Sequence, residues 1–346
     1  MSPLILFLFL AILSYFGVDL IRQYAEKHHI LDHPNERSSH KAPTPRGGGL
    51  ALVILVLAIG LYFVIQAGVN RRAIYLVCGA VIAGLGWCDD VRSLPPRLRF
   101  IVQSIVAAIS IWWLGYFKVI TIPVFGELPL GVLGIVITFL WIIGLTNAYN
   151  FMDGIDGMAG GVALSAGIGW MWLASNINNP FAFWVALAIT AGSLGFLGHN
   201  WSPAKIFMGD VGSTFLGYSF AVLPLLSSDQ GGDALLLGTL LVWTIIMDAG
   251  VTFIGRLIRR ENVFAPHRSH LYQRLVRAGY KHETISSLYI LLTLLAGFLS
   301  WEWSQGHQIA APLIFIGLPL IWIFLSVHMT RLKNAAPGTK SLARDR

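Results

Sequence analysis

The chain has 346 residues, of which 55% are hydrophobic and only 12% are charged, and its formal net charge is +7. Soluble domains carry about 25% charged residues, so this composition excludes a soluble globular protein. It predicts an all-α fold, a polytopic bundle of transmembrane helices. The two cysteines, Cys78 and Cys88, fall in one predicted helix, and that geometry excludes a disulfide between them.

Eleven apolar segments are long enough to cross a bilayer, and they alternate in direction. One set of loops, with the adjoining helix ends, holds all but three of the 24 Lys and Arg residues, the exceptions being Arg71, Arg72 and Lys118. By the positive-inside rule this set is cytoplasmic, so we expect an outside N-terminus and a cytoplasmic C-terminus. The expected spans are 3–21, 47–66, 73–89, 98–115, 131–149, 158–175, 181–198, 211–228, 235–255, 283–302 and 310–329.

The first span has neither the basic start nor the cleavage site of a signal peptide, so we expect it to remain as an anchor. The spans predict one integral-membrane domain over residues 1–329. A basic cytoplasmic tail over 330–346 is expected to lie on the anionic leaflet. In the external loop 116–130, β-branched residues around a Pro and a Gly predict a small hairpin.

The first cytoplasmic loop combines basic residues with three consecutive glycines. Lys41 and Arg46 lie shortly before Gly47, Gly48 and Gly49, which open the second span. The glycines indicate close backbone approach, either to a ligand or to another helix. The two basic side chains could meet an anion, or they could serve only as positive-inside anchors.

A pair of adjacent carboxylates, Asp89 and Asp90, closes the third span. Neighbouring side chains on a helix point about 100° apart, so both reach water only at a helix end. Two such carboxylates resist simultaneous ionisation unless a cation is near. The pair therefore indicates a Mg²⁺ site or a general base, with a solvated helix end beside Arg92 as the alternative.

The polar stretch 147–161 stands out most in this apolar chain. It contains Asn150, Asp153 and Asp156, with Gly154 and Gly157 directly after the two Asp residues. Ionisable groups at the membrane are costly and usually functional, and the glycines would let a ligand approach the backbone. The alternative is a polar loop that only breaks the helix.

The loop 199–210 contains Asn200, Phe207 and Asp210. Its amide and aromatic side chains could hydrogen-bond and stack on a base, although Phe207 would also suit packing. In the ninth span, Asp248 lies toward the cytoplasmic end. It could be structural, paired with a basic residue on another helix, or it could act directly.

The loop 256–282 contains His267, Arg268 and His270. Two His residues flanking an Arg suit phosphate oxygens, because a guanidinium can bind them with two hydrogen bonds. The His-x-x-His spacing could also bind Zn²⁺, but no Cys or third His lies close enough in sequence to complete such a site.

Taken together, these groups place carboxylates, an amide and basic side chains on the cytoplasmic face. Hard oxygen ligands favour Mg²⁺ or Mn²⁺, and the basic residues suit a diphosphate. Phosphoryl transfer needs these parts. An active site at the membrane surface indicates one soluble and one lipid substrate.

Five segments in family order make the chain resemble the polyprenyl-phosphate N-acetylhexosamine-1-phosphate transferases of glycosyltransferase family 4. It looks most like the bacterial members that initiate O-antigen synthesis for lipopolysaccharide. The loop from His267 lacks the three-histidine run of the peptidoglycan enzymes, and this departure bears on the sugar more than on the reaction. The segments are Lys41–Gly49, Asp89–Asp90, Asn147–Gly157, Asn200–Ser213 and His267–His270.

The resemblance implies that polyprenyl phosphate attacks the β-phosphorus of a UDP-N-acetylhexosamine and releases UMP. Asp210 and Asn150 match Mg²⁺ ligands of the family. Asp89 matches the residue proposed to deprotonate the lipid phosphate, and we group Asp90 and Asp153 with it as catalytic. Whether an Asp acts as a base or forms a covalent intermediate is left open.

The resemblance also assigns binding residues and partners. The expected partners are a UDP-N-acetylhexosamine, undecaprenyl phosphate and the lipid bilayer of a bacterial inner membrane, with no nucleic acid; a homodimer is left open. The donor is expected to be UDP-GlcNAc or a 6-deoxy relative, UDP-N-acetylfucosamine or UDP-N-acetylquinovosamine. Positions around the uridine are Lys41, Asp156, Asn200 and Phe207, and those near the diphosphate and sugar are His267, Arg268 and His270.

Two rival functions remain. A secondary transporter would use Asp19 and Asp248 as intramembrane coupling groups, but the polar residues gather on one face and no inverted repeat is visible. A CDP-alcohol phosphotransferase also uses Asp-Gly pairs and Mg²⁺. It needs further carboxylates soon after the Asp-Gly pair, and 157–209 contains none.

Overall fold

The computed structural model describes residues 2–34, 42–67, 71–122, 126–227, 234–262, 268–307 and 310–335. Eight helices in it are long and apolar enough to cross a membrane, which confirms the expected all-α, polytopic bundle. They are α1 (Pro3–Lys27), α2 (Gly49–Ala67), α3 (Arg71–Arg92), α4 (Pro96–Leu114), α5 (Leu133–Phe151), α6 (Met158–Asn176), α7 (Pro180–Asn200) and α12 (His282–Ser304).

The other three expected spans are also helical, but two of them are interrupted. The span expected over 211–228 is α8 (Gly209–Ser227), whereas 235–255 is divided into α9 (Ala234–Leu240) and α10 (Trp243–Ile258). The last span comprises α13 (Ala310–Pro312), a π-helical turn (Leu313–Gly317) and α14 (Leu318–Ala335). Pro319 has no N–H to donate to the preceding turn, and a π turn there accommodates this loss.

The start of the expected tail differs from the prediction. Residues 330–335 continue α14 and are helical, and the remainder of the tail lies outside the described residues. A short helix, α11 (Leu271–Arg277), lies between α10 and α12. Its place beside the candidate site is considered below.

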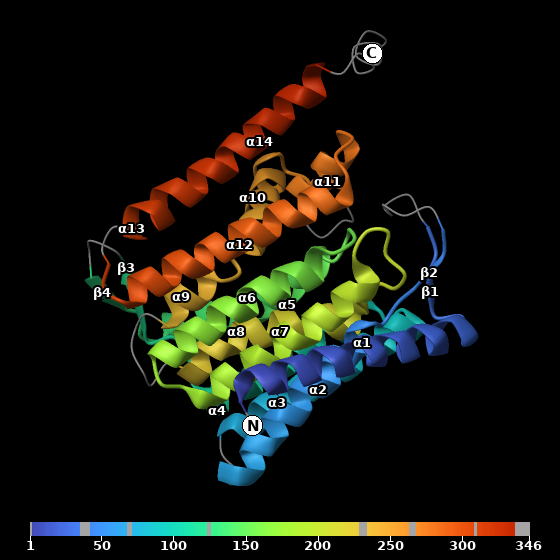
Figure 1. Cartoon of the computed structure of the whole chain (residues 1–346). Coiled ribbons are helices and arrows are strands. Elements are labelled where there is room, and N and C mark those ends of the chain that lie inside the picture. The colour runs from blue at the N-terminus through green and yellow to red at the C-terminus, as the bar shows by residue number, and fades with distance from the viewer. Residues whose placement is uncertain are drawn as a thin grey trace.

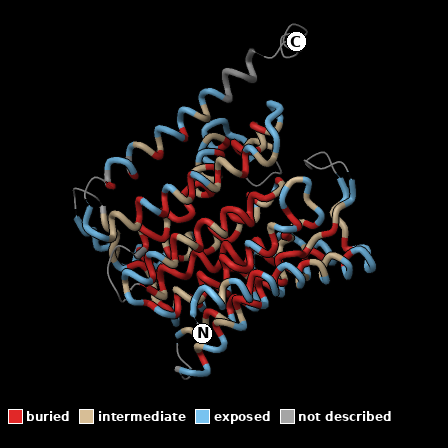
Figure 2. Tube along the Cα trace, in the orientation of Figure 1, coloured by how far each residue is buried: buried red, intermediate tan, exposed pale blue. Residues whose placement is uncertain are grey.

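Helix α8 is the centre of the bundle. It contacts α2, α3, α4, α5, α6, α7 and α9, and nearly all its side chains are buried. Figure 2 shows buried residues running through these middle helices, while α1 and α14 carry exposed residues along their outer sides. An apolar helix surrounded by others is hydrophobic on every face, and the run Phe215–Leu225 has that character.

Glycines let α2 and α3 meet the start of α8 at backbone contact. A Cβ on Gly49 would lie 2.5 Å from the Cα of Gly212, and a Cβ on Gly86 would lie 2.5 Å from the carbonyl oxygen of Asp210. The sequence left open whether the glycines that open α2 approach a ligand or another helix. Gly49 approaches another helix, α8. The contact at Gly86 brings the end of α3, with its acidic pair, against the start of α8.

The helices alternate in direction, so the polar helix ends gather at one end of the bundle. Strands β1 (Leu31–Asp32) and β2 (Thr44–Pro45) pair antiparallel there, and α11 lies toward the same end (Figure 1). At the opposite end, β3 (Val119–Ile122) and β4 (Gly126–Pro129) form the small hairpin expected over 116–130. The polar loops between helices thus share one face with β1, β2 and α11.

Candidate active site at one end of the bundle

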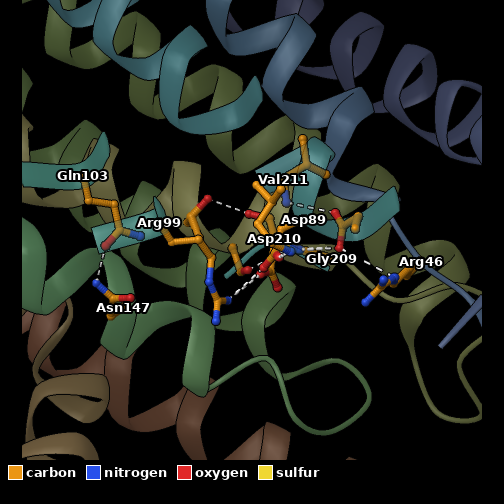
Figure 3. A network of polar contacts seen from close by, with 12 residues as sticks. Arg46, Asp89, Arg99, Gln103, Asn147, Gly209, Asp210 and Val211 are labelled. Atoms are coloured by element: carbon orange, nitrogen blue, oxygen red, sulfur yellow. Dashed lines mark hydrogen bonds and ion pairs between the residues drawn. The ribbon is translucent and has the colours of Figure 1, made fainter. Parts of the chain in front are cut away.

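An arginine lies between two carboxylates at the junction of α3, α4 and α8 (Figure 3). Arg99 Nη1 is 2.8 Å from Asp89 Oδ2 and 3.5 Å from Asp210 Oδ2. The carboxyl groups of Asp89 and Asp210 also lie within hydrogen-bonding reach of each other. One guanidinium between two acids leaves net negative charge, and such a site attracts a further cation.

Helix α4 is fixed against α5 next to this arginine. Asn147 Nδ2 donates to Gln103 Oε1 at 2.7 Å, and Gln103 lies one turn beyond Arg99 on α4. The other oxygen of Asp89 accepts the backbone N–H of Leu94. The helix of Arg99 and the Asp89 side chain are therefore each held by contacts outside the ion pair between them.

Asp90 is held differently from its neighbour Asp89. Its two oxygens accept the backbone N–H groups of Asp210 at 2.9 Å and Val211 at 3.0 Å, at the start of α8. A carboxylate is favoured there because it satisfies free N–H groups and complements the helix dipole. Arg46 Nε lies 3.9 Å from Asp90 Oδ1. The carboxylate is thus occupied in holding α8, and a direct catalytic role for Asp90 remains a prediction.

Asp153 lies in the loop 152–157, which follows the end of α5 at Phe151. Burial raises the pKa of the Asp153 carboxyl to about 7, the negative charge of Asp90 adds to this rise, and a backbone hydrogen bond from Gly209 opposes it. A carboxyl with a pKa near neutrality can both take up and release a proton. Asn150 lies in the last turn of α5, and its carbonyl oxygen accepts the Asp153 N–H at 3.1 Å.

Asp156 joins this loop to two other segments. Its Oδ2 lies 3.4 Å from His282 Nδ1 and accepts the N–H of Ala204 at 3.3 Å. Burial alone would raise the pKa of Asp156, but the hydrogen bond and charge of His282 outweigh burial and lower it. Ser286 Oγ, also on α12, donates to the Asp156 carbonyl oxygen at 2.7 Å. Asp156 therefore connects the loop to α12 and to the segment after α7.

Asn200 and Phe207, predicted to contact a nucleotide, both form hydrogen bonds that join separate loops. Asn200 Oδ1 accepts the Gly157 N–H at 2.9 Å, and its Nδ2 donates to the Ile206 carbonyl at 2.9 Å. The side chain is buried and occupied at both ends, so it braces the two loops. The backbone of Phe207 bonds to Pro45 and Gly48, which places the first loop beside the start of α8.

The predicted diphosphate loop is only partly described, because His267 lies outside the described residues, as does Lys41. Arg268 is half-buried just before α11. His270 is buried, and its Nδ1 lies 3.3 Å from Asp248 Oδ1. His270 thus faces a carboxylate of α10.

Asp248, for which a structural and a direct role were both open, holds the start of α11. Its oxygens accept the N–H groups of Leu271 at 2.7 Å and Tyr272 at 3.3 Å. Tyr289 Oη donates to the same carboxylate at 2.7 Å. With this many donors the buried carboxylate is satisfied, which supports the structural alternative. Its partners are backbone N–H groups and the Tyr289 hydroxyl, as well as the basic residue His270.

Sequence reasoning missed three residues of this region. Arg99 counted only as one more basic residue at a helix end, although it lies between the two acids. The sequence feature that could have revealed Arg99 is its place in the first turns of an apolar helix, ten residues after Asp89. His282 and Tyr272 carried no signal, because their partners lie more than 100 residues away in the chain.

The oxygen atoms of the described acidic and amide side chains suit a hard cation, although these residues form no ready-made cage. Among the described residues, no three His, Cys, Asp or Glu side chains group closely enough to hold a metal ion. Mg²⁺ is usually held by one or two carboxylates with substrate phosphates and water supplying the rest. Asp210, with Asn150 as the predicted second ligand, fits that pattern, because both offer oxygen atoms on half-buried side chains.

Comparison with known proteins gives a consistent result. The model of glycosyl transferase family 4 matches residues 72–228. A probable undecaprenyl-phosphate N-acetylglucosaminyl 1-phosphate transferase of Bacillus subtilis is 32% identical over 326 residues, which cover 91% of this chain and 88% of that protein. The decaprenyl-phosphate N-acetylglucosaminephosphotransferase of Mycobacterium leprae is 32% identical, with 83% and 80% covered.

A third relative is the undecaprenyl-phosphate alpha-N-acetylglucosaminyl 1-phosphate transferase of Escherichia coli K12. It is 29% identical over 318 residues, which cover 85% of this chain and 80% of that protein. The matches extend over nearly the whole membrane bundle as well as its polar end. This chain belongs to glycosyl transferase family 4, among the polyprenyl-phosphate N-acetylhexosamine-1-phosphate transferases.

Proposed function

We propose that the protein transfers N-acetylhexosamine 1-phosphate from a UDP-sugar to undecaprenyl phosphate and releases UMP. The observation that carries the proposal is Arg99 lying between Asp89 and Asp210 at one end of an apolar bundle, with the pair Arg46–Asp90 beside them. Such a site can serve a soluble anionic donor and a phosphate carried by a membrane lipid. The names of the relatives support the lipid acceptor and the hexosamine.

In the proposed reaction, an oxygen of the lipid phosphate forms a bond to the β-phosphorus of the donor. The bond between that phosphorus and the oxygen it shares with the α-phosphorus breaks, and UMP leaves with the electron pair. Asp89 takes a proton from the lipid phosphate where that group arrives protonated. Arg99 holds Asp89 in place and offers positive charge beside the reacting phosphates.

Asp210 and Asn150 would hold Mg²⁺ or Mn²⁺. When bound, that cation neutralises charge on the diphosphate oxygens. Asp90 fixes the start of α8 and thereby the backbone of Asp210. Asp156 and Asn200 fix the loops on either side, which keeps the shape of the donor site.

The donor we propose is UDP-GlcNAc or one of its 6-deoxy relatives, UDP-N-acetylfucosamine and UDP-N-acetylquinovosamine. The loops expected at this face have at most 27 residues, and none carries an added domain that could recognise a peptide-bearing sugar. One methyl or hydroxyl difference in an apolar pocket discriminates by about 10–200-fold. We therefore expect cross-activity among these three donors and no turnover of UDP-MurNAc-pentapeptide. The product would start O-antigen synthesis at the bacterial inner membrane.

The test is a panel of UDP-sugars incubated with membranes, Mg²⁺ and undecaprenyl phosphate, followed by UMP release and the mass of the lipid product. A lipid-diphosphate-hexosamine formed with release of UMP is the expected result. Release of CMP from CDP donors would favour the CDP-alcohol reading. Uptake of solute without nucleotide release would favour a transporter. Turnover of the pentapeptide donor at a comparable rate would contradict the donor proposal.

A further inference from the structure

The loop that carries Asp153 is held at both of its ends by residues outside it. At its far end, Asn200 accepts the N–H of Gly157 and Ser286 donates to the carbonyl of Asp156. At its near end, Tyr272 Oη donates to the carbonyl oxygen of Phe151 at 2.9 Å. This contact reaches from the short helix α11 across to the last residue of α5, directly before the loop.

Tyr272 also fills the space beside Gly154, the residue that follows Asp153. A Cβ at Gly154 would lie 2.1 Å from Tyr272 Oη and 2.9 Å from its Cζ, distances that real Cβ atoms do not reach. The sequence suggested that a missing side chain at Gly154 makes room for a ligand. In the structure, Tyr272 occupies the position that a side chain at Gly154 would take, while the backbone of Gly154 is exposed.

Helix α11 itself is held by contacts that bear on Tyr272. Asp248 accepts the N–H groups of Leu271 and Tyr272, and Tyr289 fixes that carboxylate from α12. Farther along α11, Arg274 Nη2 donates to the carbonyl of Ser326 on α14 at 3.2 Å. A helix of only two turns has little stability alone, so these contacts determine where the buried Tyr272 side chain lies.

We propose that Tyr272 is a positioning residue that sets the place of Asp153 through its contacts with Phe151 and Gly154. Asp248 acts one step farther away, because it fixes the backbone of Tyr272. The segment that leads into α11 includes Arg268 and His270. The Tyr272 side chain thereby connects this segment to the loop that carries Asp153. The inference rests on the proposed function, since the work of Asp153 lies in that reaction.

The first test is Tyr272→Phe, which removes the hydrogen bond to Phe151 and keeps the ring beside Gly154. A misplacement of about 1 Å in a catalytic group can cost up to roughly 100-fold in rate. We expect kcat to fall by roughly 10-fold, with a much smaller change in the KM for the UDP-sugar. Tyr75→Phe is the matched control, because Tyr75 is a buried tyrosine whose Oη contacts Ser219 far from the loop. Equal kinetics of Tyr272→Phe and wild type would overturn the proposal.

The second test is a compensating pair. Gly154→Ala should lower kcat because its Cβ would lie 2.1 Å from Tyr272 Oη, and adding Tyr272→Phe removes that nearest atom and leaves the smaller overlap with Cζ at 2.9 Å. The double variant should therefore be more active than Gly154→Ala alone, a coupling that independent sites do not show. Gly144→Ala is the control, since nothing lies within 4 Å of a Cβ there. Losses in the double variant that equal the product of the two single losses would contradict the contact.

A third measurement does not depend on turnover. In a Cys88→Ser background, which removes the exposed cysteine, Asp153→Cys places a thiol in the loop. Tyr272→Phe should speed alkylation of that thiol, because a released loop opens more often, and Tyr75→Phe should not. An unchanged alkylation rate would overturn the inference even in an active enzyme. Because the thiol replaces Asp153, turnover is measured in the protein that retains Asp153. A faster alkylation rate, together with no conversion of any UDP-sugar by the Asp153-containing protein, would support the inference while contradicting the proposed function.

Discussion

The carboxylate of Asp248 and the carboxylate pair of Asp89 and Asp210 have opposite surroundings. At the junction of α10 and α11, Asp248 is met by two backbone N–H groups and a tyrosine hydroxyl. At the junction of α3, α4 and α8, Asp89 and Asp210 approach each other and share Arg99. The first group has donors for its charge within the protein, whereas the second has more negative than positive charge.

This difference separates a structural acid from one available for chemistry. A buried carboxylate surrounded by donors is stable as it stands, and removing its charge leaves those donors unpaired. Two carboxylates that share one cation gain from a further cation or a proton. Asp90 lies next to Asp89 in sequence, yet its oxygens, like those of Asp248, accept the N–H groups at the start of a helix; its direct catalytic role remains a prediction.

The largest expected effect is on turnover at the α3–α4–α8 junction. Asp89→Asn should lower kcat by at least about 100-fold, the range seen when one preorganised electrostatic group is removed, and change the KM for the UDP-sugar far less. The loss should shrink at higher pH, where the lipid phosphate has already lost its proton. Steady-state kinetics across pH provide the measurement, with Asp19→Asn, a partly exposed acid on α1, as the control. A loss that stays constant with pH would leave Asp89 only an electrostatic role.

The next effect separates the two groups by stability. Asp248→Asn should lower the free energy of unfolding by about 1–3 kcal/mol, because an amide oxygen replaces a carboxylate facing several buried donors. Asp89→Asn should lower it less, since weaker contacts with Arg99 and Leu94 are offset by the removal of one of two adjacent negative charges. Thermal melting of the purified variants in one detergent gives the comparison. A larger loss of stability in Asp89→Asn than in Asp248→Asn would reverse our assignment of the two groups.

A further effect concerns Asp153 and depends on pH. Burial raises the pKa of its carboxyl to about 7, above that of the unfolded chain, so the folded state binds the extra proton. Stability from this group is therefore full at low pH and is lost as pH rises through neutrality. Asp153→Asn removes that loss, so its gain in melting temperature should be larger at about pH 8 than at about pH 5. An equal gain in melting temperature at the two pH values would show that the pKa of Asp153 is not raised.

Much of the fold and the acidic cluster could be predicted from the sequence. Long apolar segments specify helices in a membrane, and Asp89, Asp153 and Asp210 are conspicuous because ionisable groups are rare in such a chain. The division of the ninth span was not predictable, because the break at 241–242 falls in an apolar run of Leu and Val. Residue type alone favours a continuous helix there.

The roles within the site depended on contacts that the sequence does not contain. Asp89 and Asp90 are the same residue type in adjacent positions, and only the placement of α8 separates them. Asn200 had the chemistry to read a base, yet its partners are the backbones of Gly157 and Ile206. The contact of Tyr272 with Phe151 joins positions 121 residues apart, and no pattern in one sequence indicates such a contact.

The most direct test of the account is cation binding to purified protein, read from the electron paramagnetic resonance spectrum of Mn²⁺ with and without a UDP-sugar. Wild type and Asp248→Asn should both bind Mn²⁺, because Asp248 only holds α11. Asp210→Asn should lose binding and activity while still inserting in the membrane, because an amide lacks the charge that holds a hard cation. Undiminished Mn²⁺ binding by Asp210→Asn would contradict the claim that the acids between α3 and α8 form the reactive site.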